Sequence, residues 1–190
     1  MLTTTVTTAV ITRLDTRLKP QLDARLKPEL NDSRLTGKME SVFSLCLNEA
    51  SKSHLLFRHG CIATYGGKIM CKGCNTTTSS TDNFIKNSCT CHAEINVLRR
   101  MFKKYKRQYK EDKIRKIFRK TTLYISRLTN AGNSQNSAPC VDCLSMIQRF
   151  EIKRIIFYDG NVFNCINPHD YKTDHYSHGK LYVTRSQITD

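Results

Sequence analysis

In the first half of the chain, apolar residues occur either in short strand-like runs or at the spacing of a helix. Runs over residues 60–65 and 68–71 are typical of strands, and Gly66-Gly67 between them predicts a two-residue hairpin turn. Before these runs, four apolar residues recur at helical spacing and predict a first helix over residues 39–53: Val42, Leu45, Cys46 and Ala50. The first three predicted elements, from residue 39 onward, are therefore a helix and two strands.

The same alternation continues in the second half. Apolar residues recur at helical spacing after residue 92 and again after residue 140. Strand-like runs cover residues 122–126 and 154–158, and a candidate last strand covers residues 180–184. Strands that alternate with helices in this way indicate one sheet with helices on both faces.

Two short segments at the starts of the later helices carry metal-binding chemistry. One helix begins with Cys91-His92-Ala93-Glu94, and the other begins with Pro139-Cys140-Val141-Asp142-Cys143. Cys140 lies 48 positions after His92. One imidazole and two thiolates are the ligands of a zinc site that keeps a fourth position open, and a nearby carboxylate can carry protons. Amide groups at a helix N-terminus also favour thiolate over thiol. Thr90 is the candidate N-cap of the first of these helices.

A structural zinc ribbon is the rival interpretation of the cysteines. Cys71 and Cys74 form a second C-x-x-C pair, which would join the later pair in a four-cysteine site. That interpretation leaves the histidine, Glu94 and Pro139 unexplained. By contrast, H-x-E followed by P-C-x-x-C is the signature of zinc enzymes that deaminate nucleobases.

From about residue 39 to residue 161, the chain resembles the cytidine deaminase-like superfamily, particularly its deoxycytidylate deaminase branch. The segments that carry the resemblance are Gly73–Asn75, Thr90–Glu94, Thr122–Tyr124, Ser137–Cys143 and Ile152–Ile156. The resemblance implies an α/β fold, a three-layer α/β/α sandwich with a five-stranded mixed sheet.

The resemblance also implies roles for single residues, with Zn²⁺ as the cofactor. In the family an asparagine at the position of Asn75 hydrogen-bonds the sugar or base of the substrate. The implied site has three zinc ligands, one proton carrier and three substrate contacts: His92, Cys140 and Cys143; Glu94; and Asn75, Ala138 and Thr90.

The implied activity is zinc-dependent hydrolytic deamination of cytosine in a pyrimidine nucleoside or nucleotide, which releases ammonia and gives uracil. A base within RNA or DNA is the alternative, including the substrates of tRNA adenosine deaminases that share this fold. Those enzymes typically have Met before the second cysteine and Gly-Ala soon after it, whereas Asp142 precedes Cys143 here and Leu144–Met146 follow. A third hypothesis is a non-catalytic zinc-containing nucleic-acid binder, which would have no need for Glu94.

Length and composition indicate the cellular compartment of the protein and the kinds of partner it can have. The chain has 190 residues, enough for one domain with a core, and nine scattered cysteines that do not form a paired framework. We find no signal peptide and no membrane-spanning run, and expect an intracellular protein, cytoplasmic or nuclear, with no membrane partner. A homo-oligomer is also expected.

Further cysteines and histidines stand outside the implied site. Four cysteines would either hold a second, structural zinc or be small buried residues: Cys71, Cys74, Cys89 and Cys91. Three histidines and two aspartates near the C-terminus resemble a metal cluster only loosely and are interpreted as a polar loop: His169, His175, His178, Asp170 and Asp174.

Two stretches depart from the family pattern. Residues 1–38 hold a Thr-rich start and an eight-residue repeat broken by proline, which predicts a flexible extension ahead of a deaminase domain over 39–190. Arg99–Lys120 is a basic insertion with twelve Lys or Arg against Glu111 and Asp112, a net +10 of the chain's +15. Aromatic residues are interleaved with these charges. Two interpretations stay open, a solvated amphipathic helix or a surface that binds the backbone of RNA or single-stranded DNA.

Overall fold

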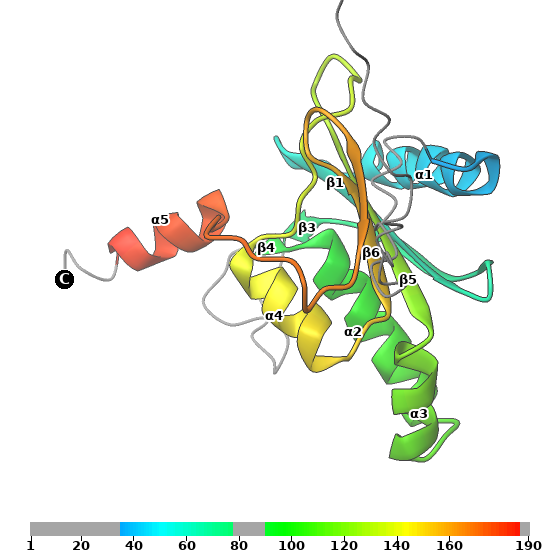
Figure 1. Cartoon of the computed structure of the whole chain (residues 1–190). Helices are drawn as coiled ribbons and strands as arrows, with labels where there is room; N and C mark the ends of the chain where they lie inside the picture. Colours follow the sequence, from blue (N-terminus) through cyan, green and yellow to red (C-terminus); the bar gives the residue numbers. More distant parts are fainter. Residues whose placement is uncertain (1–34, 78–89, 187–190) are drawn as a thin grey trace, which may run out of the picture. The chain divides into compact units, whose positions relative to one another are not determined.

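The computed structural model describes residues 35–77 and 90–186 (Figure 1). Residues 1–34 of the N-terminal extension predicted over residues 1–38 lie outside the described residues. The helices and strands run in this order: α1 (Gly37–Ala50), β1 (Arg58–Tyr65), β2 (Lys68–Cys74), β3 (Thr76–Thr77), β4 (Thr90–Cys91), α2 (Ala93–Lys106), α3 (Glu111–Phe118), β5 (Thr121–Leu128), α4 (Val141–Arg149), β6 (Arg154–Tyr158), β7 (Phe163–Ile166) and α5 (His178–Ser186).

A five-stranded mixed sheet forms the middle layer. Its strand order is β2-β1-β5-β6-β7, with β5 and β6 parallel and every other neighbouring pair antiparallel. The connection from β5 to β6 runs through α4, as a parallel pair requires. Strands β3 and β4 form a small second sheet immediately before α2.

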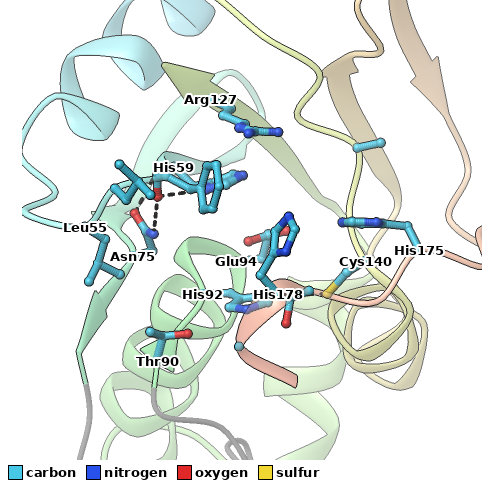
Figure 2. Close-up of a pocket in the computed structure, with 15 residues that line it drawn as sticks. Leu55, His59, Asn75, Thr90, His92, Glu94, Arg127, Cys140, His175 and His178 are labelled. Carbon is cyan, nitrogen blue, oxygen red and sulfur yellow. Dashed lines mark hydrogen bonds between the residues drawn. The ribbon is translucent and has the colours of Figure 1, made fainter. Parts of the chain in front are cut away.

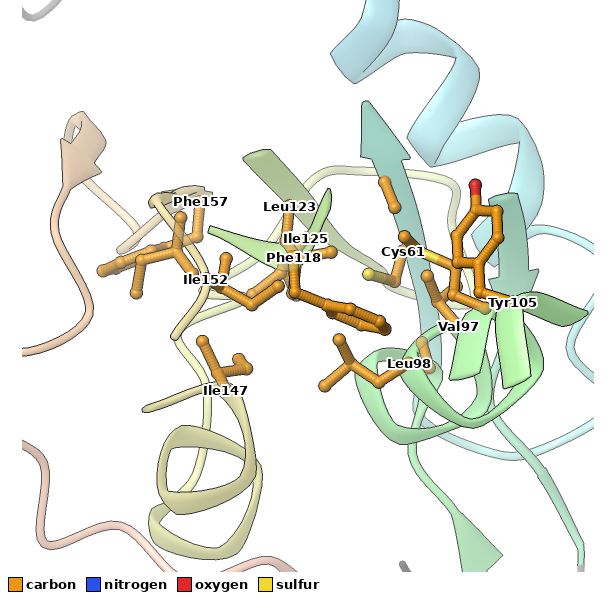
Figure 3. Packing of buried hydrophobic residues seen from close by; sticks show 14 of the residues in the cluster. Cys61, Val97, Leu98, Tyr105, Phe118, Leu123, Ile125, Ile147, Ile152 and Phe157 are labelled. Atoms are coloured by element: carbon orange, nitrogen blue, oxygen red, sulfur yellow. The ribbon is translucent and has the colours of Figure 1, made fainter. Parts of the chain in front are cut away.

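Alternate residues of the central strands bury opposite faces of the sheet, so helices cover both faces. One face packs against α2, α3 and α4 (Figure 3), and its strand residues are Cys61, Ala63, Leu123, Ile125, Ile155 and Phe157. The other face packs against α1 through Ile62, Tyr124 and Ile156. The predicted three-layer α/β/α sandwich with a five-stranded mixed sheet is therefore confirmed.

The predicted hairpin at Gly66-Gly67 is also confirmed. Tyr65 and Lys68 pair across the turn, and both glycines have positive φ, at 55° and 77°. A two-residue turn with positive φ at both positions matches the twist of the flanking strands, and glycine adopts that backbone without a Cβ penalty.

The predicted last strand over residues 180–184 is wrong, because those residues belong to α5. The fifth strand is instead Phe163–Ile166, which pairs with β6 and occupies that edge of the sheet. Ser177 starts α5: its hydroxyl accepts a hydrogen bond from the backbone N–H of Lys180 at 3.3 Å. A capping serine thus outweighs the strand-like composition of the run.

Thr90 does not cap the helix that follows it. It lies in β4, and the N-cap of α2 is His92. The helices predicted after residues 92 and 140 are confirmed, with Cys140 as the N-cap of α4. Neither N-cap side chain satisfies a helix amide, so both side chains are directed to other partners.

The basic insertion folds as the end of α2, a short turn and α3. Its apolar side of Tyr105, Ile114 and Phe118 is buried in the main core. The amphipathic packing expected for this stretch is therefore present. In the described parts of the chain, no helix combines the length and the apolar composition needed to cross a bilayer.

A close approach between α1 and β1 at Gly60 gives the first prediction. A Cβ at this position would lie 2.6 Å from the backbone nitrogen of Ala50 and closer still to the carbonyl oxygen of Cys46. Because backbone atoms cannot yield as a side chain would, Gly60→Ala is expected to lower the free energy of unfolding by about 1–3 kcal/mol or more. Chemical denaturation measures this loss.

Gly37→Ala is the matched control, because nothing lies within 4 Å of a Cβ at that position in the first turn of α1. Its unfolding free energy should stay level or rise by up to about 1 kcal/mol. Equal stability of the two variants would contradict the close packing of α1 on β1.

Candidate metal centre and active site

Two helix N-termini bring His92, Cys140 and Cys143 together. His92 and Cys140 are the N-caps of α2 and α4, and Cys143 lies in the first turn of α4. The Nδ1 atom of His92 lies 3.1 Å from the Cys143 sulfur and 3.5 Å from the Cys140 sulfur. All three ligand atoms fall within 4.8 Å of one another. Both helix dipoles present their positive ends to the sulfurs, which stabilises thiolates.

The donor set fits zinc. Tetrahedral zinc with ordinary bond lengths separates a nitrogen from a sulfur ligand by about 3.5 Å, close to the separations found here. Three protein ligands leave a fourth position, as in catalytic rather than structural zinc sites. Within residues 35–77 and 90–186, no other group of three or more His, Cys, Asp or Glu side chains is placed to hold a metal.

Protonation couples the three side chains. A hydrogen bond from the Cys143 thiol is the main cause that lowers the pKa of Cys140 to about 4. That same hydrogen bond, together with burial, raises the pKa of Cys143 well above its usual value. Burial lowers the pKa of His92, but the Cys140 thiolate and Glu94 outweigh it and raise the pKa to about 9. Metal ligands must be deprotonated, so zinc binding would displace these protons.

Glu94 is buried beside this triad, in the first turn of α2, with 4% of its surface exposed. Burial is the main cause that raises its pKa, and His92 partly opposes the shift. A carboxyl whose pKa is raised in this way holds a proton more readily than a solvated carboxyl does, which suits a group that must accept a proton during a reaction. Glu94 is therefore a buried carboxyl of the site and not a solvated residue of the helix surface.

A pocket of about 280 Å³ opens above the triad (Figure 2). It contains six of the seven side chains that the sequence suggested: Asn75, Thr90, His92, Glu94, Ala138 and Cys140. Cys143 is fully buried and does not line the pocket. Segments from six separate regions of the chain thus meet at one cavity.

Asn75 connects the pocket to the start of β1. Its Nδ2 donates to the carbonyl of Phe57 at 2.7 Å, and its Oδ1 accepts from the backbone N–H of His59 at 2.8 Å. An amide side chain has two donor hydrogens and two acceptor lone pairs, so one of each remains for a ligand. Asn75 is therefore held in place by the backbone.

Sequence reasoning missed the cationic and aromatic wall of this pocket. His59 and Arg127 are direct partners in the antiparallel pair of β1 and β5, so their side chains lie on the same face. Phe57 contacts both the Arg127 guanidinium, at 4.9 Å from its ring centroid, and the His178 ring, at 5.2 Å between centroids. His175 also lines the pocket. No local pattern marks Phe57, His59 or Arg127, and the sequence assigned His175 and His178 only to a polar loop, because strand register and the return of the chain bring these residues together.

The charge states of these groups differ. Burial is the main cause that lowers the pKa of His59 to about 4, so its imidazole is neutral. Its Nδ1 lies 3.3 Å from the carbonyl of Phe57, which leaves Nε2 as an acceptor when Nδ1 carries the hydrogen. Arg127 keeps its charge and, within the described residues, has no carboxylate partner.

The C-terminal segment interpreted as a polar loop supplies part of the pocket. Its backbone is tied to the triad because the carbonyl of His175 accepts a hydrogen bond from Val141 N–H, in the first turn of α4. His175 and His178 line the cavity, whereas His169, Asp170 and Asp174 do not.

The remaining cysteines do not assemble a second site in the described parts of the chain. Cys71 and Cys74 are partly buried in β2 and belong to no metal-binding group there, and Cys91 is buried. Cys89 lies outside the described residues. The ribbon of Cys71 and Cys74 with Cys140 and Cys143 is therefore not formed, because the later pair is combined with His92.

Comparison with known proteins gives a family match and several distant structural likenesses. A search of curated protein sequences gave no match. The cytidine deaminase from Burkholderia pseudomallei is 14% identical, aligns over 75% of this chain and 100% of its own, and has a TM-score of 0.49. The dCMP deaminase from the cyanophage S-TIM5, in complex with dCMP and dUMP, is 20% identical over 64% of this chain and 82% of its own, with a TM-score of 0.43.

Both TM-scores lie below 0.5, so the assignment rests on the family match. The model of the cytidine and deoxycytidylate deaminase zinc-binding region matches residues 36–159, well over half of the chain. That range contains the triad and Glu94. The chain belongs to the cytidine and deoxycytidylate deaminase zinc-binding family, and its cofactor is zinc.

Proposed function

We propose that the protein catalyses hydrolytic deamination of the cytosine base of a pyrimidine nucleoside or nucleotide. The observation that carries this proposal is the buried carboxyl of Glu94 beside a three-ligand zinc set at the floor of a pocket. The reaction consumes water and releases ammonia, leaving uracil in place of cytosine.

His92, Cys140 and Cys143 would hold the metal. When bound, zinc acidifies water toward a pKa of about 7 and so makes a nucleophile available at neutral pH. Glu94 accepts a proton from the attacking water and delivers it to the ring nitrogen next to the attacked carbon. It then takes the second proton of that water, which is released as the new C–OH becomes a carbonyl, and passes it to the departing amine. The raised pKa of Glu94 suits this shuttle, because the protonated form is accessible between the two transfers.

Polar groups on the pocket wall are matched to the edge of a cytosine. The backbone N–H of Ala138 already donates to Asn136 Oδ1 at 2.9 Å, so its carbonyl is the group left to accept from an exocyclic amine. Asn75 offers one donor and one acceptor to the sugar or base. Thr90 lines the same wall.

The two alternatives draw on different features. A non-catalytic zinc protein does not explain Glu94, because burying an ionisable carboxyl costs stability and such a protein would gain nothing from it. A base within RNA or DNA is favoured by the basic insertion alone. The missing Met and Gly-Ala around Cys143 favour cytosine over the adenine of tRNA adenosine deaminases.

Cys140→Ala is expected to lose bound zinc, because two remaining ligands cannot hold it against dilution. Metal analysis of the purified protein measures this. Cys74→Ala is the matched control and should keep one equivalent of zinc per chain. A full equivalent in Cys140→Ala would overturn the ligand assignment.

Glu94→Gln is expected to lower the rate of ammonia release by about 10²–10⁴-fold, with zinc content and fold retained. The amide keeps the size of the carboxyl but cannot carry the proton. Exposed Glu40, in the first turn of α1, provides the control Glu40→Gln, which should have wild-type activity. Substantial turnover by Glu94→Gln would remove this residue from the mechanism.

Arg127 supports a phosphorylated substrate, because its half-buried guanidinium faces a pocket with few anions. Charge-assisted hydrogen bonds contribute about 1.5–3 kcal/mol, so Arg127→Gln should lower kcat/KM for deoxycytidylate about 10–100-fold. Deoxycytidine should be affected much less. Arg154→Gln, at the opposite end of β6 from the pocket, is the control. Equal losses for both substrates would show that Arg127 does not recognise phosphate.

A further inference from the structure

The end of α2 and the whole of α3 present a dense basic surface. We define this α2–α3 basic surface by the exposed cations of residues 103–120, which are Lys103, Lys104, Lys106, Arg107, Lys110, Lys113, Arg115, Lys116, Arg119 and Lys120. Only Glu111 and Asp112 oppose them within the same stretch. In the described residues, Arg115 and Arg119 form ion pairs with carboxylates, whereas Lys103, Lys106 and Arg107 form none.

Packing fixes this surface in place. Tyr105, Ile114 and Phe118 are buried in the core on the inner side of the same helices. The cations therefore project from a rigid support rather than from a free tail. Tyr109 remains 37% exposed among them, and the ammonium of Lys113 lies 4.0 Å from its ring centroid.

A second pocket, of about 300 Å³, opens between α2, α3 and α4 next to these cations. Three aromatic rings line it: Phe118 and Phe150 stack with centroids 4.8 Å apart, and Phe102 lies 5.7 Å from Phe150. Arg115 and Arg149 stand at the same pocket, and so do Glu111 and Glu151, the two carboxylates that form ion pairs with Arg115. Aromatic walls beside guanidinium groups suit a flat, partly polar ring that is attached to a phosphate.

This surface is remote from the zinc triad. Helix α2 has 14 residues, which at a rise of 1.5 Å per residue span about 21 Å. His92 stands at one end of α2, and the basic surface begins in its last turn and continues into α3 (Figure 1). A ligand held here would leave the catalytic pocket unobstructed.

We propose that the α2–α3 basic surface binds single-stranded nucleic acid, with phosphates on its lysines and arginines and a base in the Phe102–Phe150 pocket. Charge complementarity identifies a polyanion, and the aromatic pocket identifies one with accessible planar bases. A duplex keeps its bases stacked and would use the charges alone. This binding is separate from the proposed deamination and does not depend on it.

The test is fluorescence anisotropy with labelled oligo(dT) and oligo(U) strands longer than a site of about 4–16 nucleotides, at increasing salt. Wild-type affinity should fall as salt rises, by about 0.7 log units per contacted phosphate for each log unit of salt. Replacing Lys103, Lys106 and Arg107 together with Gln should weaken binding to both strands and flatten the slope by up to about 2.

A matched variant separates this surface from overall charge. Lys38, Lys68 and Lys172 are exposed and lie outside α2 and α3, so replacing them with Gln removes the same charge. This control should bind as the wild type does. Zinc content and circular dichroism establish that both variants fold. Equal weakening by the two variants, or no salt-sensitive binding by the wild type, would overturn the proposal.

Two further probes distinguish nucleic acid from other polyanions. Phe102→Leu keeps the site apolar but removes a ring, and should weaken oligonucleotide binding roughly tenfold while leaving binding of inorganic polyphosphate unchanged. Equal effects on both probes would remove the base pocket from the proposal. Binding to phosphatidylserine vesicles, with no binding to either oligonucleotide, would replace nucleic acid with a membrane as the partner of this surface.

Discussion

The convergence of two helix N-termini on one imidazole and two sulfurs is the constraint on which the rest of the site depends. His92 is the N-cap of α2, and Cys140 is the N-cap of α4. The distance between these two ligands therefore depends on how α2 and α4 are placed relative to each other. Cys91, Ile95, Cys140 and Cys143 form a small buried cluster at this point. Movement of either helix would therefore separate the metal ligands and would also expose the apolar surface of this cluster.

Glu94 follows from the same constraint. One residue separates it from His92, and the first turn of α2 carries it toward the cavity rather than to the surface. The pairing of β1 with β5 adds His59 and Arg127, and the contact between His175 and the start of α4 adds the C-terminal wall. The metal ligands and Glu94 are thus concentrated at one end of α2, whereas Arg99–Lys120, which runs from the middle of α2 to the residues after α3, carries a net charge of +10.

The parts predicted from sequence are those that depend on local pattern. Apolar runs at residues 60–65 and 122–126 marked central strands, and apolar residues at helical spacing after residues 92 and 140 marked the two helices that carry the metal ligands. The prediction of a strand over residues 180–184 was wrong, because strand-like composition does not show whether an edge of the sheet is free to pair. Phe163–Ile166 occupies that edge, and Ser177 starts a helix instead. The places of Arg127 and His178 at the pocket could not be predicted from a local pattern, since they depend on the register of β1 on β5 and on the return of the chain.

X-ray absorption at the zinc edge of the purified protein tests the central claim most directly, because it reports the ligand types around the metal. Sulfur and nitrogen or oxygen ligands lie at distinguishable distances from zinc. The arrangement of His92, Cys140 and Cys143 predicts two sulfur ligands and two lighter ones per zinc. A shell of four sulfurs, or purified protein without zinc, would contradict the account.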